Sequence, residues 1–299
     1  PSRGAEFNHD FRSEPLADSP SLHSMQFSDF NGWWFCLIPT ETIRTIGLGL
    51  PVFIKFDDIE YGLRAKEHGV PTISLPGVAV WHMGWHDKDP ARGWEEYFTQ
   101  RNRWICALLH FPNAAKHSAF RMLYEEAHLG MRLLYSGMKL NHMALSDVLL
   151  GPSHLIDSLP TKLNEVRKAR EGFDDSTTYA ERNWAPRPAS TVTKMGMQAV
   201  LKALRSRGTG KSDKSPQVSI PARFSIWPAF LGVNSAIVTT PDGDSVSWFR
   251  RDSKLYRRNM LQCFRLTCKL MKNWKRLSRE YREYGIASME TWEHIFRDA

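Results

Sequence analysis

The chain has 299 residues, of which 42% are hydrophobic and 24% charged. These proportions exclude a globally disordered chain, a collagen-like repeat and a coiled coil. Lys and Arg outnumber Asp and Glu by 40 to 32, a net charge of +8, which is compatible with an anionic membrane surface, a nucleic acid or a phosphorylated substrate. The length fits one large domain or two of medium size.

The four cysteines form no Cys-x-x-Cys pair and stand in apolar contexts: Cys36, Cys106, Cys263 and Cys268. They predict reduced, buried thiols and an intracellular protein. No apolar run in the sequence reaches the ~20 residues that a membrane span requires. The chain begins without Met, in polar sequence that lacks a signal-peptide pattern, which indicates a piece of a longer protein or a processed one.

The first third of the chain reads as α/β. The expected elements are an arm over 1–29, a buried strand over 30–38, a short helix from Thr40 to Gly47, an extended segment over 51–56, a helix from Asp57 closed by Gly69, strands over 72–75 and 78–81, and a helix over 93–110. Strand, helix and strand within ~30 residues are typical of an α/β domain. We expect this domain to cover 1–110.

The remainder, 111–299, predicts a mainly helical C-terminal domain. Apolar residues recur at helical spacing from 116 to 207, including Phe120 and Leu133, and a polar break lies over 174–189. Residues 206–222 read as a linker, and a small β-hairpin is expected to turn at Asp242-Gly243. A long helix over 252–282 and a shorter one over 289–296 complete the expected elements.

Two adjacent carboxylates stand where a strand is expected to pass into a helix, in the string Lys55-Phe56-Asp57-Asp58. One carboxylate could accept a proton from a substrate hydroxyl while the other orients that hydroxyl. The alternative is structural, because acidic residues are also common as caps and first-turn residues of helices.

Two further strings carry side chains suited to a binding site. His82, in Trp81-His82-Met83-Gly84-Trp85, could be a metal ligand or contact a phosphate, or be a structural histidine. Gln100-x-x-Arg103-Trp104 lies on the helix expected over 93–110, and an Arg beside an aromatic ring could hold a diphosphate.

Taken in this order, the acidic pair, the histidine and Gln-x-x-Arg-Trp resemble the second half of an inverting family 2 glycosyltransferase of the GT-A fold. The strings GWWFCLIP, FIKFDDIEYGLRA and WHMGWHDKDPARGWEEYFTQRNRW resemble the polymerising galactofuranosyltransferases of mycobacteria more closely. The resemblance implies transfer of galactofuranose from UDP-galactofuranose to a lipid-linked galactan, with alternating β-1,5 and β-1,6 linkages. It also implies a homotetramer at the cytoplasmic face of the plasma membrane.

The resemblance also implies roles for individual residues. Asp58 matches the general base and Asp57 the residue that places the acceptor; His82 matches a ligand of Mn²⁺ or Mg²⁺. The residues matched to substrate binding are Trp33, Trp34 and Trp85 of the acceptor groove, Lys55 beside it, and Gln100, Arg103 and Trp104 of the motif associated with processive enzymes.

One expected motif is missing. The metal and uridine site of these enzymes needs an Asp-x-Asp motif upstream of the acceptor half, whereas both such strings here, at Asp87 and Asp242, follow the candidate base. The sequence therefore predicts the acceptor half of a GT-A domain without its donor half, inactive on its own.

The segment 250–282 carries twelve basic and two acidic residues, so it accounts for more than the whole net charge. Tyr256, Phe264, Leu270, Met271 and Trp274 fall near one helical face. A basic amphipathic helix suits an anionic bilayer surface; the alternative is that the apolar stripe packs on the domain. Because no second basic element or recognition motif accompanies the helix, nucleic acid is not an expected partner.

Two other functions stay open from the sequence. One is a non-catalytic module that docks on a membrane or in an assembly through the basic helix. The other is a family 2 transferase for a different sugar, because a tryptophan-rich groove suits many glycans.

Overall fold

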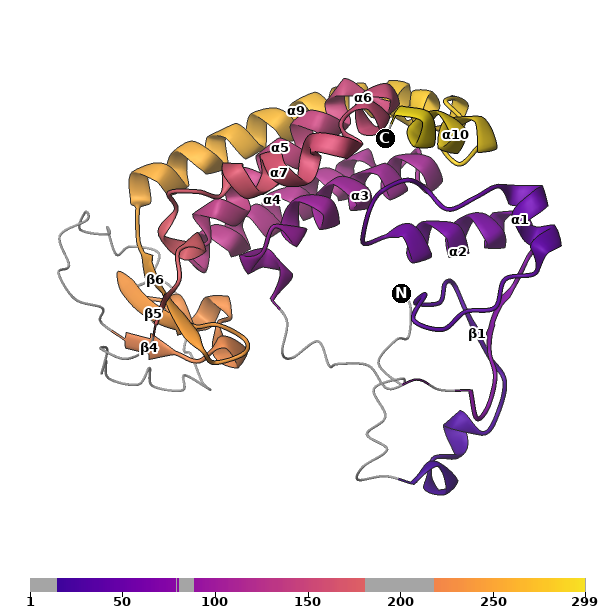
Figure 1. Ribbon diagram of the computed structural model, residues 1–299. Helices are drawn as coiled ribbons and strands as arrows, with labels where there is room; N and C mark the ends of the chain where they lie inside the picture. Colours follow the sequence, from indigo (N-terminus) through magenta and orange to yellow (C-terminus); the bar gives the residue numbers. More distant parts are fainter. Residues whose placement is uncertain (1–14, 79, 81–88, 181–217, 299) are drawn as a thin grey trace. The chain divides into compact units, whose positions relative to one another are not determined.

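The computed structural model describes residues 15–78, 80, 89–180 and 218–298 (Figure 1). The chain divides into two compact units: Pro1–His82 with Tyr284–Ala299, and Met83–Glu283. The first unit mixes short strands with helices, and the second is mainly helical with a small sheet. This confirms the predicted fold class. The predicted domain boundary near residue 110 stays a prediction. The helix that ends at residue 110 lies in the second unit.

In the described residues of the first unit there are two 3-10 turns, two short strands and three helices. They are η2 (Leu16–Asp18), η3 (Pro20–Leu22), β1 (Gln26–Ser28), α1 (Thr40–Ile46), α2 (Asp57–Glu67), β2 (Thr72–Ser74) and α10 (Met289–Asp298). The two strands pair antiparallel, with Phe27 opposite Ile73. Ile46, Tyr61 and Ala65 form a small core between α1 and α2. The last expected helix is thus present, and it belongs to the same unit as the candidate acidic pair.

Two predictions about the first unit are wrong. Residues 30–38 form bends rather than a buried strand, and Trp34, Phe35 and Leu37 are exposed. The strand that pairs with β2 lies earlier, inside the segment predicted as an arm. Residues 51–56 are not extended either, because Phe53, Lys55 and Phe56 adopt positive φ angles. Only Val78 and Val80 of the second expected strand are described, and neither is in a strand.

The second unit is a helical bundle with a turn before it. Its elements are η5 (Pro90–Arg92), α3 (Glu95–His110), α4 (Ala115–Met131), α5 (Tyr135–Leu150), α6 (Pro152–Asp157), α7 (Leu159–Ala169), η6 (Asp174–Ser176) and α9 (Ser253–Glu283). Helix α5 packs on α3 and α9, and α4 packs on α9. The prediction of a mainly helical region is confirmed for its described part, although Leu133 and Leu134, which were expected within a helix, are buried in the turn between α4 and α5. Phe120 is an exception: it lies on the outer face of α4 with 70% of its surface exposed.

A four-stranded sheet joins the bundle in the order β3-β6-β5-β4. Its strands are β3 (Tyr179–Ala180), β4 (Val218–Ile220), β5 (Ser235–Thr239) and β6 (Ser245–Arg250), with 3-10 turns η8 (Ala222–Phe224) and η9 (Trp227–Phe230) between β4 and β5. The β5–β6 hairpin turns through Gly243, as predicted. The predicted linker is wrong in its described part, because Val218–Ile220 pairs parallel with β5 and Ile220 is buried in a core cluster with helix residues such as Met138.

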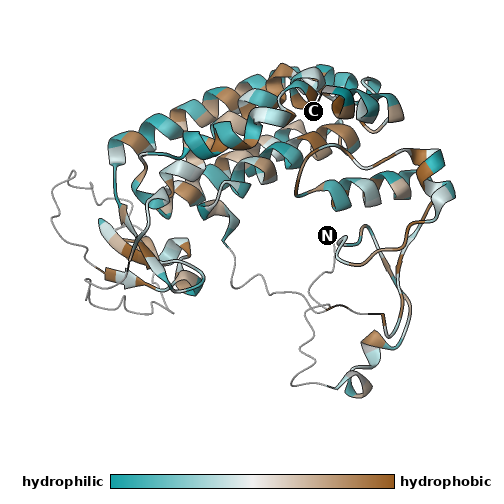
Figure 2. Ribbon diagram, in the orientation of Figure 1, coloured by the Kyte–Doolittle hydropathy of each residue, from teal (hydrophilic) through white to brown (hydrophobic). Residues whose placement is uncertain are grey.

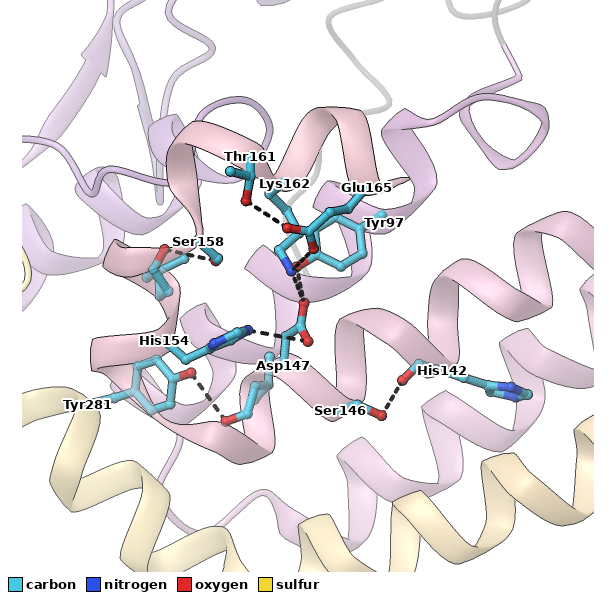
Figure 3. Close-up of polar contacts among 12 residues, drawn as sticks. Tyr97, His142, Ser146, Asp147, His154, Ser158, Thr161, Lys162, Glu165 and Tyr281 are labelled. Atoms are coloured by element: carbon cyan, nitrogen blue, oxygen red, sulfur yellow. Dashed lines mark hydrogen bonds and ion pairs between the residues drawn. The ribbon is translucent and has the colours of Figure 1, made fainter. Parts of the chain in front are cut away.

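A buried polar group holds four helices of the bundle together (Figure 3). The Tyr97 hydroxyl of α3 donates to Asp147 Oδ2 on α5 at 2.7 Å. Lys162 of α7, only 4% exposed, lies with Nζ 3.0 Å from the same oxygen, and His154 of α6 lies 3.4 Å from Oδ1. Since an unpaired buried charge is costly, the pairing fixes how α5, α6 and α7 meet.

Helix α9 buries one face and exposes the other, and its ribbon alternates between hydrophobic and hydrophilic residues (Figure 2). Leu270, Trp274 and Leu277 of the apolar stripe are buried in the bundle. The structure therefore supports packing on the domain for these residues, whereas Phe264 and Met271 of the same predicted stripe are exposed. No helix in the described ranges combines the length and hydropathy of a membrane span.

The thiols differ in burial. Cys106 and Cys263 are buried and Cys268 is half-buried, but Cys36 is exposed in the 30–38 segment. The prediction that all four are buried is wrong for Cys36, because the strand expected to bury it is absent there.

Helix α9 begins with a side-chain cap, which allows a stability test. Asp252 Oδ1 accepts hydrogen bonds from the backbone N–H groups of Lys254 and Leu255 at 3.0 and 2.8 Å. We expect Asp252→Ala to lower the free energy of unfolding by about 1 kcal/mol, measured by urea denaturation. Asp252→Ser retains an acceptor and should lose much less; equal losses for both variants would contradict the capping role.

Candidate functional site

The acidic pair lies at the first turn of α2, behind an unusual backbone. Lys55 and Phe56 have φ angles of 65° and 66°, in the left-handed region that residues with a Cβ rarely adopt. Helix α2 then begins at Asp57, and Phe56 O accepts the hydrogen bond of Glu60 N at 2.9 Å. Such conformations concentrate at functional sites, where the surroundings hold them in place. The structure thus brings Lys55, Asp57 and Asp58 together at one helix end.

Asp58 is half-buried and its environment suits a proton acceptor. Burial raises the pKa of Asp58, and the neighbouring charge of Asp57 adds to the increase. The backbone N–H of Ile59, which donates to Asp58 Oδ1 at 2.8 Å, acts in the opposite direction. A carboxylate with a raised pKa is a stronger base than a fully solvated one. Asp57 and Asp58 also occupy the first turn of α2, as the structural alternative expects, although the N-cap residue itself, Phe56, offers no side-chain cap.

An aromatic surface lies on the same unit. The Trp33 ring packs edge-on against Tyr61 of α2, with ring centroids 5.4 Å apart, and 38% of Trp33 stays exposed. Trp34 is 56% exposed and lies against Gly32. Partly exposed indole rings on a supporting helix are suited to stacking on sugar faces.

The loop that supports Trp33 is held from two sides by residues that the sequence did not indicate. Arg64 donates two hydrogen bonds to Glu60, and donates to the carbonyls of Ile46 and Leu48. From the C-terminal segment, Ala287 O accepts from Leu48 N at 3.1 Å.

The last helix completes this support. Trp292 Nε1 of α10 donates to Gly49 O at 2.9 Å. Gly49 packs so close to Trp33 that an added Cβ would lie 3.2 Å from the ring. The spacing of Glu60 and Arg64 is a signal for a helical ion pair. No local signal links Trp292 to Gly49, because 243 residues separate them.

The Gln-x-x-Arg-Trp residues lie in the second unit, on α3, as an internal network. Gln100 Nε2 donates to Glu96 Oε1 at 2.9 Å, and Arg103 bridges Gln100 Oε1 and Glu125 of α4. Gln100 and Trp104 are 3% and 2% exposed. Their visible roles are in packing and hydrogen bonding, and substrate contact by these residues stays a prediction.

His82 and Trp85 lie outside the described residues, so the structure says nothing of their predicted roles. The described residues include one buried group that could hold a metal ion, Glu126, His142 and Cys263, in the second unit. A thiol is a poor ligand for Mn²⁺ or Mg²⁺, which prefer oxygen. The described part of the chain therefore does not itself offer the expected metal site.

Comparison with known proteins identifies the class. Residues 1–107 match the family model described as glycosyltransferase like family 2, and residues 120–298 match the one described as galactofuranosyltransferase-2, domain 3. The class is thus that of the family 2 glycosyltransferases. More particularly, the chain belongs to the galactofuranosyltransferase-2 family, which confirms the resemblance found in its sequence.

Two curated relatives bear this out. Galactofuranosyltransferase GlfT2 of Mycobacterium tuberculosis (strain ATCC 25618 / H37Rv) is 33% identical over 310 residues, which cover 97% of this chain and 48% of that protein. GlfT2 of Mycolicibacterium smegmatis (strain ATCC 700084 / mc(2)155) is 32% identical over 312 residues, with the same coverage. The chain spans about half the length of these relatives.

The buried carboxyl of Glu96 makes the motif network sensitive to pH. Burial raises the pKa of Glu96 to about 7, with the Gln100 hydrogen bond opposing the shift. Because the pKa of a glutamate in the unfolded chain is about 4.3, the unfolded state loses this proton at a lower pH than the folded state does. Glu96 therefore makes stability fall as pH rises from about 4.3 to about 7.

We expect Glu96→Gln to remove this dependence. The difference in free energy of unfolding between variant and wild type should shift in favour of the variant by about 3 kcal/mol from pH 4 to pH 8, measured by urea denaturation. Glu95→Gln, in the same turn but less buried, is the matched control. A pH-independent difference for Glu96→Gln would show that the carboxyl is not held protonated.

Proposed function

We propose that this chain is the acceptor and catalytic-base portion of a galactofuranosyltransferase that extends a galactan from UDP-galactofuranose. The family membership supports the transfer of galactofuranose. The observation that carries the assignment of the site is the half-buried Asp58 at the first turn of α2, the helix whose Tyr61 packs against the partly exposed Trp33. We further propose a lipid-linked acceptor and alternating β-1,5 and β-1,6 linkages, following the family resemblance.

In the proposed mechanism, Asp58 removes the proton of the acceptor hydroxyl as its oxygen attacks the anomeric carbon. The bond from that carbon to the diphosphate of UDP breaks on the opposite face, so the configuration inverts. Burial favours this step by raising the pKa of Asp58. Asp57 and Lys55 orient the acceptor, and Trp33, Trp34 and Trp85 stack on its sugar rings.

The donor side of the reaction is proposed to involve residues outside the described part of this chain. Mn²⁺ or Mg²⁺, when bound, would neutralise the charge that develops on UDP, and His82 is the ligand proposed from this chain. A protein of the relatives' length has room for a donor-binding portion, and we infer that this chain is inactive without one.

We propose a peripheral position on the cytoplasmic face of the plasma membrane, and assembly as a homotetramer. The outer face of α9 supports membrane contact. Its exposed basic residues are Lys254, Arg257, Arg258, Arg265, Lys269, Lys272, Lys275, Arg276, Arg279 and Arg282. Leu261 and Phe264 are exposed among them, so this face offers both charge and apolar contacts to anionic lipid.

The base assignment is tested by Asp58→Asn in a chain supplemented with, or extended by, the donor-binding portion. We expect turnover to fall by about 10²–10⁴-fold, because the amide cannot accept the proton. In the active enzyme, kcat/KM should fall as pH falls through the raised pKa of Asp58, since protonation removes the base.

Asp29→Asn is the matched control, because it removes an exposed carboxylate from the same unit and should leave turnover unchanged. Near-normal turnover of a folded Asp58→Asn enzyme would overturn the assignment.

Membrane contact is tested by the double change Lys269→Glu and Lys272→Glu, with sedimentation of vesicles that contain phosphatidylglycerol. We expect binding to fall at least about tenfold, since each basic residue near an anionic surface contributes about 1 kcal/mol, and to weaken with added salt. The matched control is the double change Lys116→Glu and Lys168→Glu, which alters the net charge by the same amount but on α4 and α7. An equal loss for both pairs would indicate net charge rather than a binding face.

A further inference from the structure

Three helices of the second unit bring metal-binding side chains to one buried point. Glu126 comes from α4, His142 from α5 and Cys263 from α9, and their ligand atoms all lie within 4.8 Å of one another. Glu126 and Cys263 have no exposed surface, and His142 is 3% exposed. The His142 ring leaves α5 away from the Asp147 group, so the two polar centres are separate (Figure 3).

The polar atoms of this cluster are only partly satisfied by one another. His142 Nε2 lies 2.7 Å from Glu126 Oε1, and Asn141 Nδ2 donates to Glu126 Oε2 at 3.1 Å. Asn141 Oδ1 is also buried but has no hydrogen-bond partner. The amide nitrogen of Asn141, and not its oxygen, faces Glu126, so Asn141 holds the carboxylate in place and the converging donor atoms are those of Glu126, His142 and Cys263.

Electrostatics also favours a cation at this point. A buried carboxylate and a buried thiolate together would be costly without one, and one divalent ion balances both charges.

We propose that Glu126, His142 and Cys263 bind a divalent transition-metal ion of the zinc class, with Asn141 orienting the Glu126 carboxylate through its hydrogen bond to Oε2. The mixture of sulfur, nitrogen and oxygen donors favours Zn²⁺ over Mn²⁺ or Mg²⁺. Binding forms the metal–sulfur bond and releases the thiol proton to solvent. Because its donors are buried and come from α4, α5 and α9, the ion is a structural cross-link of the bundle, independent of the galactofuranosyl transfer proposed above.

The first test measures metal in the purified full chain by inductively coupled plasma mass spectrometry. We expect about one zinc ion per chain after expression with zinc and removal of loose metal by a chelator. Cys263→Ser should lose the ion, whereas Cys268→Ser, further along α9, should keep it. Retention of the ion by a folded Cys263→Ser would overturn the assignment.

The second test does not depend on a variant that folds poorly. Wild-type chain refolded with Co²⁺ should develop thiolate-to-metal absorption near the ultraviolet and a visible band of tetrahedral Co²⁺, and its thermal midpoint should rise. Cys268→Ser should give the same spectrum, and added zinc should displace the Co²⁺ and remove both bands. If no zinc copurifies and no thiolate band develops after refolding with Co²⁺, the cluster is a metal-free hydrogen-bonded network and the proposal is wrong.

Discussion

Backbone polar groups need partners, and this constraint shapes the first unit. The segment between α1 and α2 has no regular secondary structure, so its carbonyls cannot be satisfied within a helix or sheet. Arg64 supplies donors for Ile46 O and Leu48 O, while Glu60 holds its guanidinium in position. The same side chain therefore anchors both the loop beneath Trp33 and the helix that carries Asp58. A substitution of Arg64 would disturb the aromatic surface and the acidic pair together, because one charged group serves both.

The C-terminal helix has a structural connection that its position in the sequence conceals. Trp292 and Ala287 hydrogen-bond to the loop over 47–50, so the last residues of the chain complete the unit in which Asp58 lies. Helix α9, which precedes these residues, has two faces with different roles. Leu270 and Trp274 fill the bundle, while basic side chains line the opposite face. The periodic separation of apolar from basic residues therefore shows that α9 is amphipathic, but it does not reveal which partner the apolar face contacts.

These features explain which predictions from the sequence held. Helical periodicity located α3 and α9, and Asp242-Gly243 located the hairpin, because each signal is local. The run Trp33–Ile38 was misassigned because an apolar run has the same composition in a buried strand and in an exposed aromatic surface. The acidic pair could be found from Asp57-Asp58, but its left-handed approach could not, since Lys55 and Phe56 are not residues that favour positive φ. The support from Arg64 and Trp292 depends on tertiary contacts that no spacing encodes.

The residues of the Gln-x-x-Arg-Trp string have structural contacts in addition to the substrate contact predicted for them. Trp104 is buried in the bundle, and Gln100 and Arg103 connect Glu96 to Glu125 across α3 and α4. Arg103 lies between Gln100 and Glu125 and so connects α3 to α4. Arg121 pairs with Glu125 as well, so the network continues along α4. A predicted substrate contact by α3 would therefore be made from a helix that this network ties to its neighbour.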